Sequence, residues 1–288
     1  LLSTGTGPSE RKGHKMVAIN GVLFVFGGTE VAFNVPGALS DLWQYDLATN
    51  AWSPITAAGG PSGRLNCAMA ASGGKVWVYG GMTGLSGSSL LSDLFVFDPW
   101  TNAWTDMTQV EPPPSGRHSA SMAAANGKLY LYGGNDFVNY LPDLHVFDTA
   151  GEFWTTLTGK PGSPSGRFES GVSVLDNKLY VFGGQAITAS GGGSWVDEFY
   201  VFDLAAEEWT ELTDATTPGN AWAPMVASDD SLYILGNPGS AGSAQHLHVY
   251  APGCAPQTQG CVPIATTAEP APPTTTLAAA PATTPMPT

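Results

Sequence analysis

The chain is poor in charge, in cations and in cysteine. Of its 288 residues 12% are charged, with 10 Lys and Arg against 24 Asp and Glu, so the formal net charge is −14. A surface this acidic repels phosphate backbones, which disfavours nucleic acid as a partner. No apolar run approaches the ~20 residues that a membrane-spanning helix needs. We therefore predict neither nucleic-acid binding nor a transmembrane segment in these residues.

Short motifs of common catalytic and metal sites are also missing. The sequence contains no HExxH, no CxxC pair and no Gly-x-Ser-x-Gly turn, and its five histidines are scattered. On this basis we predict no catalytic residue, no metal site and no cofactor.

Glycine, by contrast, is abundant, and pairs of it recur at a regular interval. The pairs are Gly27-Gly28, Gly80-Gly81, Gly133-Gly134 and Gly183-Gly184, followed by a degraded Gly236-Asn237. The first members of successive pairs are 53, 53, 50 and 53 residues apart. Each pair follows an aromatic, strand-like segment. A period near fifty built of strands is typical of a radially repeated β-architecture.

The third unit shows what one repeat contains. It opens with the turn sequence Pro114-Ser115-Gly116-Arg117, and a two-residue hairpin is expected at Asn126-Gly127. The four predicted strands are His118–Ala125, Lys128–Tyr132, Asp143–Asp148 and Phe153–Leu157. The first of them is nearly all small residues, which suits a strand crowded by its neighbours near a central axis.

Two further residue types recur once in each of the first four units. An Asp closes each third strand and is predicted to cap the next turn by accepting backbone N–H groups. A Trp anchors each fourth strand and is predicted to bury ~150–250 Å² between adjacent units. These residues are Asp46, Asp98, Asp148 and Asp203, and Trp52, Trp104, Trp154 and Trp209. We disfavour the Asp residues as metal ligands, because one per unit places them far apart.

Together these features resemble the kelch repeat, over about Gly7 to Ala251. The resemblance implies an all-β fold, a kelch-type β-propeller with five recognisable four-stranded blades, of which the last is degenerate. It also implies a binding module for protein–protein interaction that is not an enzyme. Two arrangements stay open: residues 1–6 complete a five-bladed ring, or upstream blades belong to a six- or seven-bladed ring. We favour the second.

The remaining segments are assigned by composition. Residues 1–6 are expected to be the remnant of a preceding blade's outer strand, 7–251 the propeller, 252–264 a Cys-containing Gly/Pro segment and 265–288 a disordered tail. The Thr/Pro/Ala-rich tail resembles an O-glycosylated stalk, with an unmodified linker as the alternative. Cys254 and Cys261 are candidates for a small disulfide, and Cys67 is expected to be a buried apolar residue rather than a reactive thiol. We expect an extracellular or cell-surface setting, with a cytoplasmic one as the alternative.

Candidate binding residues lie where the loops after the Gly pairs and the turns before the first strands open on one face. The loop aromatics are Phe33, Phe137, Tyr140 and Trp195. They are of the type that anchors partners, although each loop could instead pack on its own blade. A ring of arginines is expected at the same face: Arg11, Arg64, Arg117 and Arg167. They would accept an acidic peptide, as in some kelch-type ubiquitin-ligase adaptors, or bond carbonyls of the neighbouring blade.

Two alternative functions remain beside protein binding. Galactose-oxidase-like copper enzymes also use kelch-type propellers, but their Tyr/His/Tyr copper site with a Tyr–Cys crosslink is not specified by this sequence. The loop aromatics are also compatible with carbohydrate binding.

Overall fold

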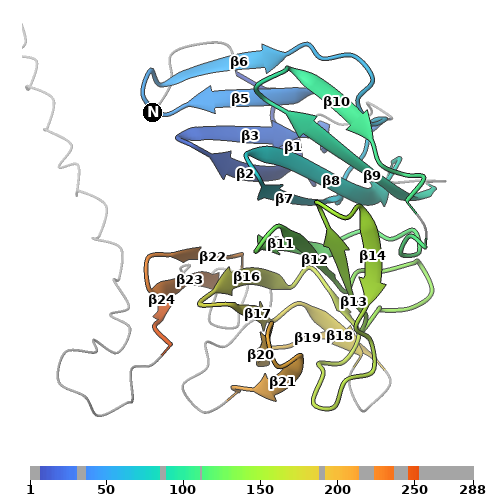
Figure 1. Ribbon diagram of the computed structural model, residues 1–288, viewed down its shortest axis with the longest axis vertical. Coiled ribbons are helices and arrows are strands. Elements are labelled where there is room, and N and C mark those ends of the chain that lie inside the picture. Colours follow the sequence, from blue (N-terminus) through green and yellow to red (C-terminus); the bar gives the residue numbers. More distant parts are fainter. Residues whose placement is uncertain are drawn as a thin grey trace, which may run out of the picture.

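The computed structural model describes residues 7–30, 37–84, 89–110, 112–187, 192–213, 224–236 and 246–252 (Figure 1). Within these ranges all regular secondary structure is β-strand, and there is no helix of the length and apolarity needed to cross a membrane. Four antiparallel sheets of four strands and one of three follow the repeats in order. We call them blades I to V.

The first two blades each contain four strands, which are named from the innermost outwards. Blade I consists of β2 (Lys15–Ile19), β3 (Val22–Phe26), β5 (Leu42–Asp46) and β6 (Ala51–Ile55). Blade II consists of β7 (Ala68–Ser72), β8 (Lys75–Met82), β9 (Leu90–Asp98) and β10 (Ala103–Asp106).

The other blades have the same antiparallel order. Blade III consists of β11 (Ser121–Ala125), β12 (Lys128–Tyr132), β13 (Leu144–Asp148) and β14 (Phe153–Thr156). Blade IV consists of β16 (Gly171–Leu175), β17 (Lys178–Phe182), β20 (Phe199–Asp203) and β21 (Glu208–Glu211). Blade V has three described strands, β22 (Met225–Ser228), β23 (Ser231–Gly236) and β24 (His246–Tyr250).

Small sheets extend blades I and IV at one end. Above blade I, β1 (Arg11–Lys12) pairs with β4 (Thr29–Glu30). Above blade IV, β15 (Arg167–Phe168), β18 (Gln185–Ile187) and β19 (Gly193–Trp195) form a three-stranded sheet. In these two blades the pairings join the turn before the first strand to the loop after the Gly pair. They confirm that both kinds of segment open on one face, which we call the loop face.

The two-residue hairpins at the opposite face form as predicted. Both central residues have positive φ at each of the four sites, which is the type I′ geometry that fits the twist of antiparallel strands. The values are 49° and 79° at Asn20-Gly21, 60° and 73° at Gly73-Gly74, 51° and 72° at Asn126-Gly127, and 50° and 56° at Asp176-Asn177.

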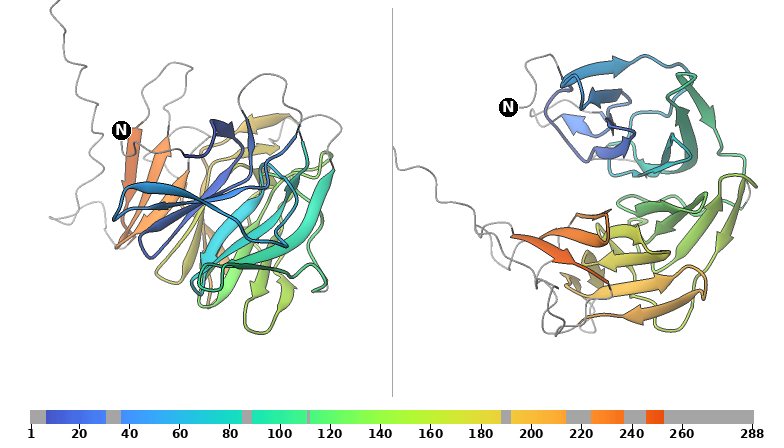
Figure 2. Two further views of the ribbon diagram at one scale, coloured as in Figure 1. Left: turned by 90° about the horizontal axis from the view of Figure 1, so that it is seen from above. Right: turned by 60° about the vertical axis from the view of Figure 1, so that its left-hand side comes forward.

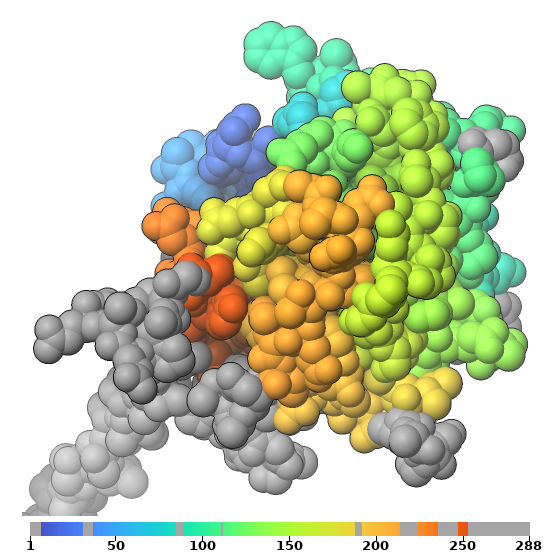
Figure 3. Space-filling model, turned by 60° about the horizontal axis from the view of Figure 1, so that its bottom comes forward, coloured from blue at the N-terminus to red at the C-terminus, as the bar shows by residue number. Residues whose placement is uncertain are grey.

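The blades follow one another in an arc, with their first strands innermost (Figure 2). Each inner strand lies beside that of the next blade, in the order β2, β7, β11, β16 and β22. Small side chains permit this close approach, as in the sequence Ala-Met-Ala-Ala-Ser of β7. Figure 3 shows the outer strands of blade IV, in orange, packed against blade III in yellow-green, and one buried apolar cluster is shared by both blades.

Indole rings seal the interfaces between blades, as predicted. Trp154 of blade III lies 5.6 Å from the ring of Tyr79 in blade II and 5.0 Å from Phe147 in its own blade. Trp209 contacts Tyr132 of the preceding blade in the same way, at 5.8 Å. Aromatic pairs at these centroid distances add to the stabilisation from apolar burial.

Both glycines of a pair are required by close backbone contacts. An added Cβ at Gly133 would lie 2.4 Å from the carbonyl oxygen of Arg167 in the next blade, and one at Gly134 would lie 3.0 Å from the carbonyl oxygen of His118. Their φ values of 68° and 104° also favour glycine. The N–H of Gly134 donates to the Arg167 carbonyl at 2.9 Å, so the pair hydrogen-bonds one blade to the next.

Closure of the ring is not established by the described residues. Met16 on β2 is 56% exposed, whereas Met69 and Met122 at the same position of blades II and III are 7% and 8% exposed. Val226 on β22 is 60% exposed. The number of blades that complete the ring therefore stays a prediction.

Several predictions fall outside the described residues. They concern the strand remnant at residues 1–6, Phe33, the Cys254–Cys261 disulfide and the tail at 265–288. These assignments, and the extracellular setting drawn from two of them, stay predictions.

Candidate functional site

Each of the four predicted arginines is held by a carboxylate of its own blade. Arg64 Nη1 and Nη2 donate to Asp93 at 2.5 and 2.8 Å, and Arg11 donates to both oxygens of Asp41 at 2.7 and 2.8 Å. Arg167 pairs with Glu198 at 2.5 Å. A bidentate arginine–carboxylate pair is among the stronger polar contacts in proteins.

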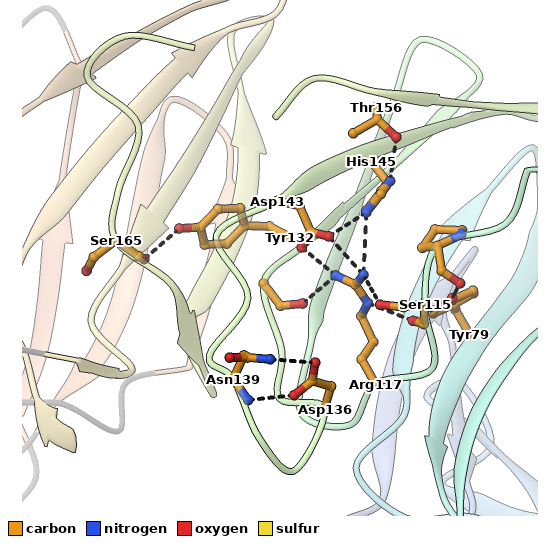
Figure 4. A network of polar contacts seen from close by, with 12 residues as sticks. Tyr79, Ser115, Arg117, Tyr132, Asp136, Asn139, Asp143, His145, Thr156 and Ser165 are labelled. Carbon is orange, nitrogen blue, oxygen red and sulfur yellow. Dashed lines mark hydrogen bonds and ion pairs between the residues drawn. The ribbon is translucent and has the colours of Figure 1, made fainter. Parts of the chain in front are cut away.

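The network around Arg117 shows how completely such a guanidinium is occupied (Figure 4). It donates to Asp143 at 2.5 and 2.9 Å, to the Gly133 carbonyl at 3.0 Å and to the Ser115 carbonyl at 3.0 Å. His145 Nε2 lies 2.7 Å from the same carboxylate. Burial opposes ionisation of Asp143, but the hydrogen bonds from His145 and Arg117 outweigh it and hold the pKa of that carboxyl well below its usual range.

The structure therefore corrects the binding interpretation of the arginine ring. Arg64, Arg117 and Arg167 are 0%, 1% and 0% exposed, and the side chain of Arg11 is 4% exposed. Each guanidinium donates to a carboxylate and to the carbonyl of the first Gly of the pair. An acidic peptide cannot reach them. The alternative, in which the arginine side chains bond carbonyls of the neighbouring blade, also needs a correction. Each arginine side chain bonds the Gly carbonyl of its own blade, whereas the backbone carbonyls of Arg64, Arg117 and Arg167 accept a hydrogen bond from the neighbouring blade.

A ladder of backbone hydrogen bonds runs across the blades two residues after each arginine. The N–H of Asn66 donates to Gly13 at 2.8 Å, that of Ser119 to Asn66 at 2.7 Å, and that of Glu169 to Ser119 at 3.0 Å. All four residues have left-handed φ values between 53° and 68°. The sequence did not reveal this ladder, because Gly, Asn, Ser and Glu share no side-chain chemistry.

The four ladder residues line a polar pocket of about 290 Å³, to which all five blades contribute. We call it the channel mouth. Its lining is Gly13, His14, Lys15, Asn66, Ser119, Ser121, Glu169, Ser170 and Pro224. Burial and the nearby Arg11 lower the pKa of His14, so the imidazole is neutral at physiological pH. Burial raises the pKa of Glu169, although the charge of Lys15 and a hydrogen bond from Ser119 oppose the shift.

Apolar side chains gather on the loop face above blades III and IV. Phe137, Val138, Ile187 and Trp195 are 53%, 83%, 50% and 40% exposed, and we call them the apolar patch.

Buried and half-buried aromatic residues connect the two halves of the apolar patch. His118 stacks 5.3 Å from Phe137 and 6.1 Å from Phe168, and Phe168 lies 4.8 Å from Tyr140. The Tyr140 hydroxyl donates to Gln185 at 3.2 Å, on the strand that pairs directly with Trp195. Contacts thus run without a break from the loop of Phe137 in blade III to the strand that pairs with Trp195 in blade IV.

The loop that presents Phe137 and Val138 is pinned by its own side chains. Asn135 Oδ1 accepts the N–H of Phe137 at 2.6 Å, and Asp136 Oδ1 accepts the N–H groups of Val138 and Asn139 at 2.9 and 2.5 Å. A further bond joins Asn139 Nδ2 to Asp136 Oδ2 at 3.1 Å (Figure 4). Phe137 itself adopts a φ of 73°. Such strain in a well-bonded segment is typical of functional sites.

Other predicted residues have structural roles. Tyr140 packs against Phe168 and bonds Gln185, which agrees with the local-packing alternative. The Asp residues that close the third strands cap their turns as predicted; Asp148, for instance, accepts the N–H groups of Ala150 and Gly151 at 3.0 and 2.8 Å. Those two bonds lower its pKa. Cys67 is fully buried, and burial raises the pKa of its thiol, which leaves it unreactive.

Metal chemistry finds no support in the described ranges. Within them no three His, Cys, Asp or Glu side chains gather where they could hold an ion.

Radially arranged four-stranded blades, each carrying a Gly pair and an interblade Trp, define a repeat-built β-propeller. The KLHDC2/KLHL20/DRC7 Kelch-repeats domain model matches residues 1–134 and 86–255. The chain belongs to the kelch-repeat family.

Individual relatives match a little under half of the chain. Kelch domain-containing protein 3 of Homo sapiens is 30% identical over 138 residues, which is 46% of this chain and 36% of that protein. F-box/kelch-repeat protein At1g67480 of Arabidopsis thaliana is 37% identical over 128 residues, 44% of this chain and 32% of that protein. Alpha-scruin of Limulus polyphemus is 30% identical over 137 residues, 46% of this chain and 14% of that protein. The matches thus span about a third of the first two relatives' length and less of the third.

Proposed function

We propose that this chain is a non-catalytic module that binds a protein partner through the apolar patch. Kelch-repeat proteins are generally protein-interaction modules, which supports the class of function. The observation that carries the proposal is the pinned loop, which holds Phe137 and Val138 53% and 83% exposed. Exposed apolar side chains lose water contacts favourably when a partner covers them.

Preorganisation strengthens the case for binding. Because the loop is already fixed by Asn135 and Asp136, little conformational entropy is lost when a partner docks. Trp195 and Phe137 are also of the residue type that dominates interface energetics. The local-packing alternative explains Tyr140, but it does not account for the 53% and 83% exposure of Phe137 and Val138.

A random peptide library displayed on phage tests the proposal and does not require the partner to be identified. Peptides are selected on the protein, and their affinities are then measured against the double variant Phe137→Ser/Val138→Ser and against Trp195→Ser. We expect affinity to fall by at least about tenfold, the effect of losing ~1.4 kcal/mol of contact free energy.

Trp100→Ser is the matched control. Trp100 is 94% exposed, but it lies in the turn between β9 and β10, on the face opposite the loops. Peptides that bind Trp100→Ser as weakly as the patch variants, or that bind every variant equally, would contradict the proposal.

A further inference from the structure

Glu169 differs from the other carboxylates that are removed from water near the loop face. Asp41, Asp93, Asp143 and Glu198 each pair with an arginine of their own blade. Glu169 is half-buried and forms no ion pair among the described residues, although the charge of Lys15 acts on it from a longer distance. Its side chain has one hydrogen bond, from Ser119 Oγ at a long 3.4 Å. A half-buried carboxylate with so little compensation is costly to keep charged.

Glu169 also breaks the symmetry of the repeat. The same position of the ladder holds Gly13, Asn66 and Ser119 in blades I to III, and none of these side chains carries a charge. The backbone bond that builds the ladder does not need a carboxylate, because the donor is the main-chain N–H. The structural role of the position therefore leaves the charge of Glu169 unexplained.

The channel mouth and the apolar patch are contiguous. His118, which stacks on Phe137, lies with its Nδ1 3.1 Å from Ser119 Oγ, and that hydroxyl is the one bonded to Glu169. Phe168, beneath the patch, immediately precedes Glu169 in the chain. A segment held on the patch is thus within a few residues' reach of the pocket.

We propose that the channel mouth accepts a lysine or arginine side chain of the partner, with Glu169 as its ionic acceptor. The pocket, at about 290 Å³, is large enough for such a side chain, and Ser119, Ser121 and Asn66 add oxygen acceptors for its N–H groups. A net charge of −14 favours approach of a basic partner. Lys15 lines the same pocket from blade I, and its charge partly offsets that of Glu169.

The identity of the partner rests on the proposed function, whereas the pocket can be tested by itself. N-acetyl-arginine amide is titrated against the full chain, and backbone amide shifts of Asn66, Ser119 and Glu169 are followed by NMR. N-acetyl-citrulline amide, which has the same shape and no charge, is the control ligand. We expect saturable shifts with the arginine compound, none with citrulline, and none in Glu169→Gln.

Glu152→Gln is the matched protein control. Glu152 is an exposed glutamate with a left-handed φ of 56°, in the turn between β13 and β14 on the opposite face. It should respond as the wild type does. Equal responses to both ligands, an unchanged response in Glu169→Gln, or no response would each overturn the proposal.

The selected peptides provide a second, separate measurement. Peptides that depend on Trp195 should carry a basic residue near their apolar anchor, and Glu169→Gln should weaken them by about tenfold. Replacing that basic residue with norleucine should remove the sensitivity to Glu169→Gln. Patch-dependent peptides without this coupling contradict the basic-side-chain proposal and leave the proposed function intact. If the arginine compound binds but no patch-dependent peptides are found, the basic-side-chain proposal stands and the proposed function is contradicted.

Discussion

Arg117 and Asp143 are joined by two hydrogen bonds of 2.5 and 2.9 Å, with the arginine 1% exposed. The pair ties the turn before β11 to the start of β13 within blade III. Equivalent pairs occur in blades I, II and IV, so this is a structural element of the repeat.

Replacing Arg117 with alanine should strongly destabilise the protein. The change removes the fork that binds Asp143 and leaves a carboxylate that is 18% exposed without its cation. Breaking a buried pair in this way costs about 3–5 kcal/mol, measured as the free energy of unfolding in urea. Lys160→Ala, which breaks the exposed pair with Glu207, should cost less than ~1 kcal/mol. Similar losses in the two variants would refute the structural role given to Arg117.

The contributions of Asp143 and Glu169 to folding stability should change in opposite directions as the pH falls. The pKa of Asp143 is depressed in the folded protein, so its stabilisation is complete above the ordinary carboxyl pKa of about 4 and is lost as the pH falls through the folded value. The pKa of Glu169 is raised, so its charge costs stability at neutral pH, and this cost disappears as the group protonates.

Unfolding free energies measured between pH 7 and pH 2 should separate the two groups. Asp143→Asn should be less stable than the wild type at pH 7, and the difference should shrink towards low pH. Glu169→Gln should be as stable as the wild type at pH 7 or more so, and this gain should also vanish in acid. A destabilised Glu169→Gln at pH 7 would show that the charged carboxylate contributes to the fold.

Replacing a tryptophan between blades should destabilise the protein far more than replacing an exposed one. Trp154 is 6% exposed between Tyr79 and Phe147, so Trp154→Ala should cost about 3–5 kcal/mol through lost burial and the cavity left behind. Trp100→Ala removes a side chain that is 94% exposed and should change the thermal midpoint little. Calorimetry of both variants decides the point, and equal midpoints would mean that the indole of Trp154 does not hold the blades together.

Local and periodic features of the sequence were sufficient to predict most of the fold. Hairpins such as Asn126-Gly127 depend on two adjacent residues, and the Trp154 interface repeats with the period of the blades. Both signals are visible in one sequence, because neither depends on where the variable loops go.

The partners of the arginines could not be predicted in the same way. The acceptors lie 30, 29, 26 and 31 residues after Arg11, Arg64, Arg117 and Arg167. They follow loops of different length, and one of them is Glu rather than Asp, so no fixed spacing marks them. The apolar patch has the same limitation, because Phe137 and Trp195 belong to different blades and are connected only through side-chain contacts between those blades.

A comparison of two glycines in blade III can distinguish the cost of backbone strain from the cost of a close contact. Gly133 and Gly127 have similar φ values of 68° and 72°. An added Cβ at Gly133 would meet the Arg167 carbonyl oxygen at 2.4 Å, whereas at Gly127 the nearest atom is Thr149 Oγ1 at 3.8 Å. Gly127→Ala should therefore cost only the left-handed strain of about 1–2 kcal/mol.

Gly133→Ala carries the same strain and must also displace the backbone of blade IV. The hydrogen bond from Gly134 to the Arg167 carbonyl, at 2.9 Å, lies in the path of that displacement. We expect Gly133→Ala to cost at least about twice as much as Gly127→Ala in urea unfolding. Hydrogen exchange should also speed up at Gly134. Equal costs would mean that the Gly pair is retained for its backbone angles alone, and that the approach of the next blade places no demand on it.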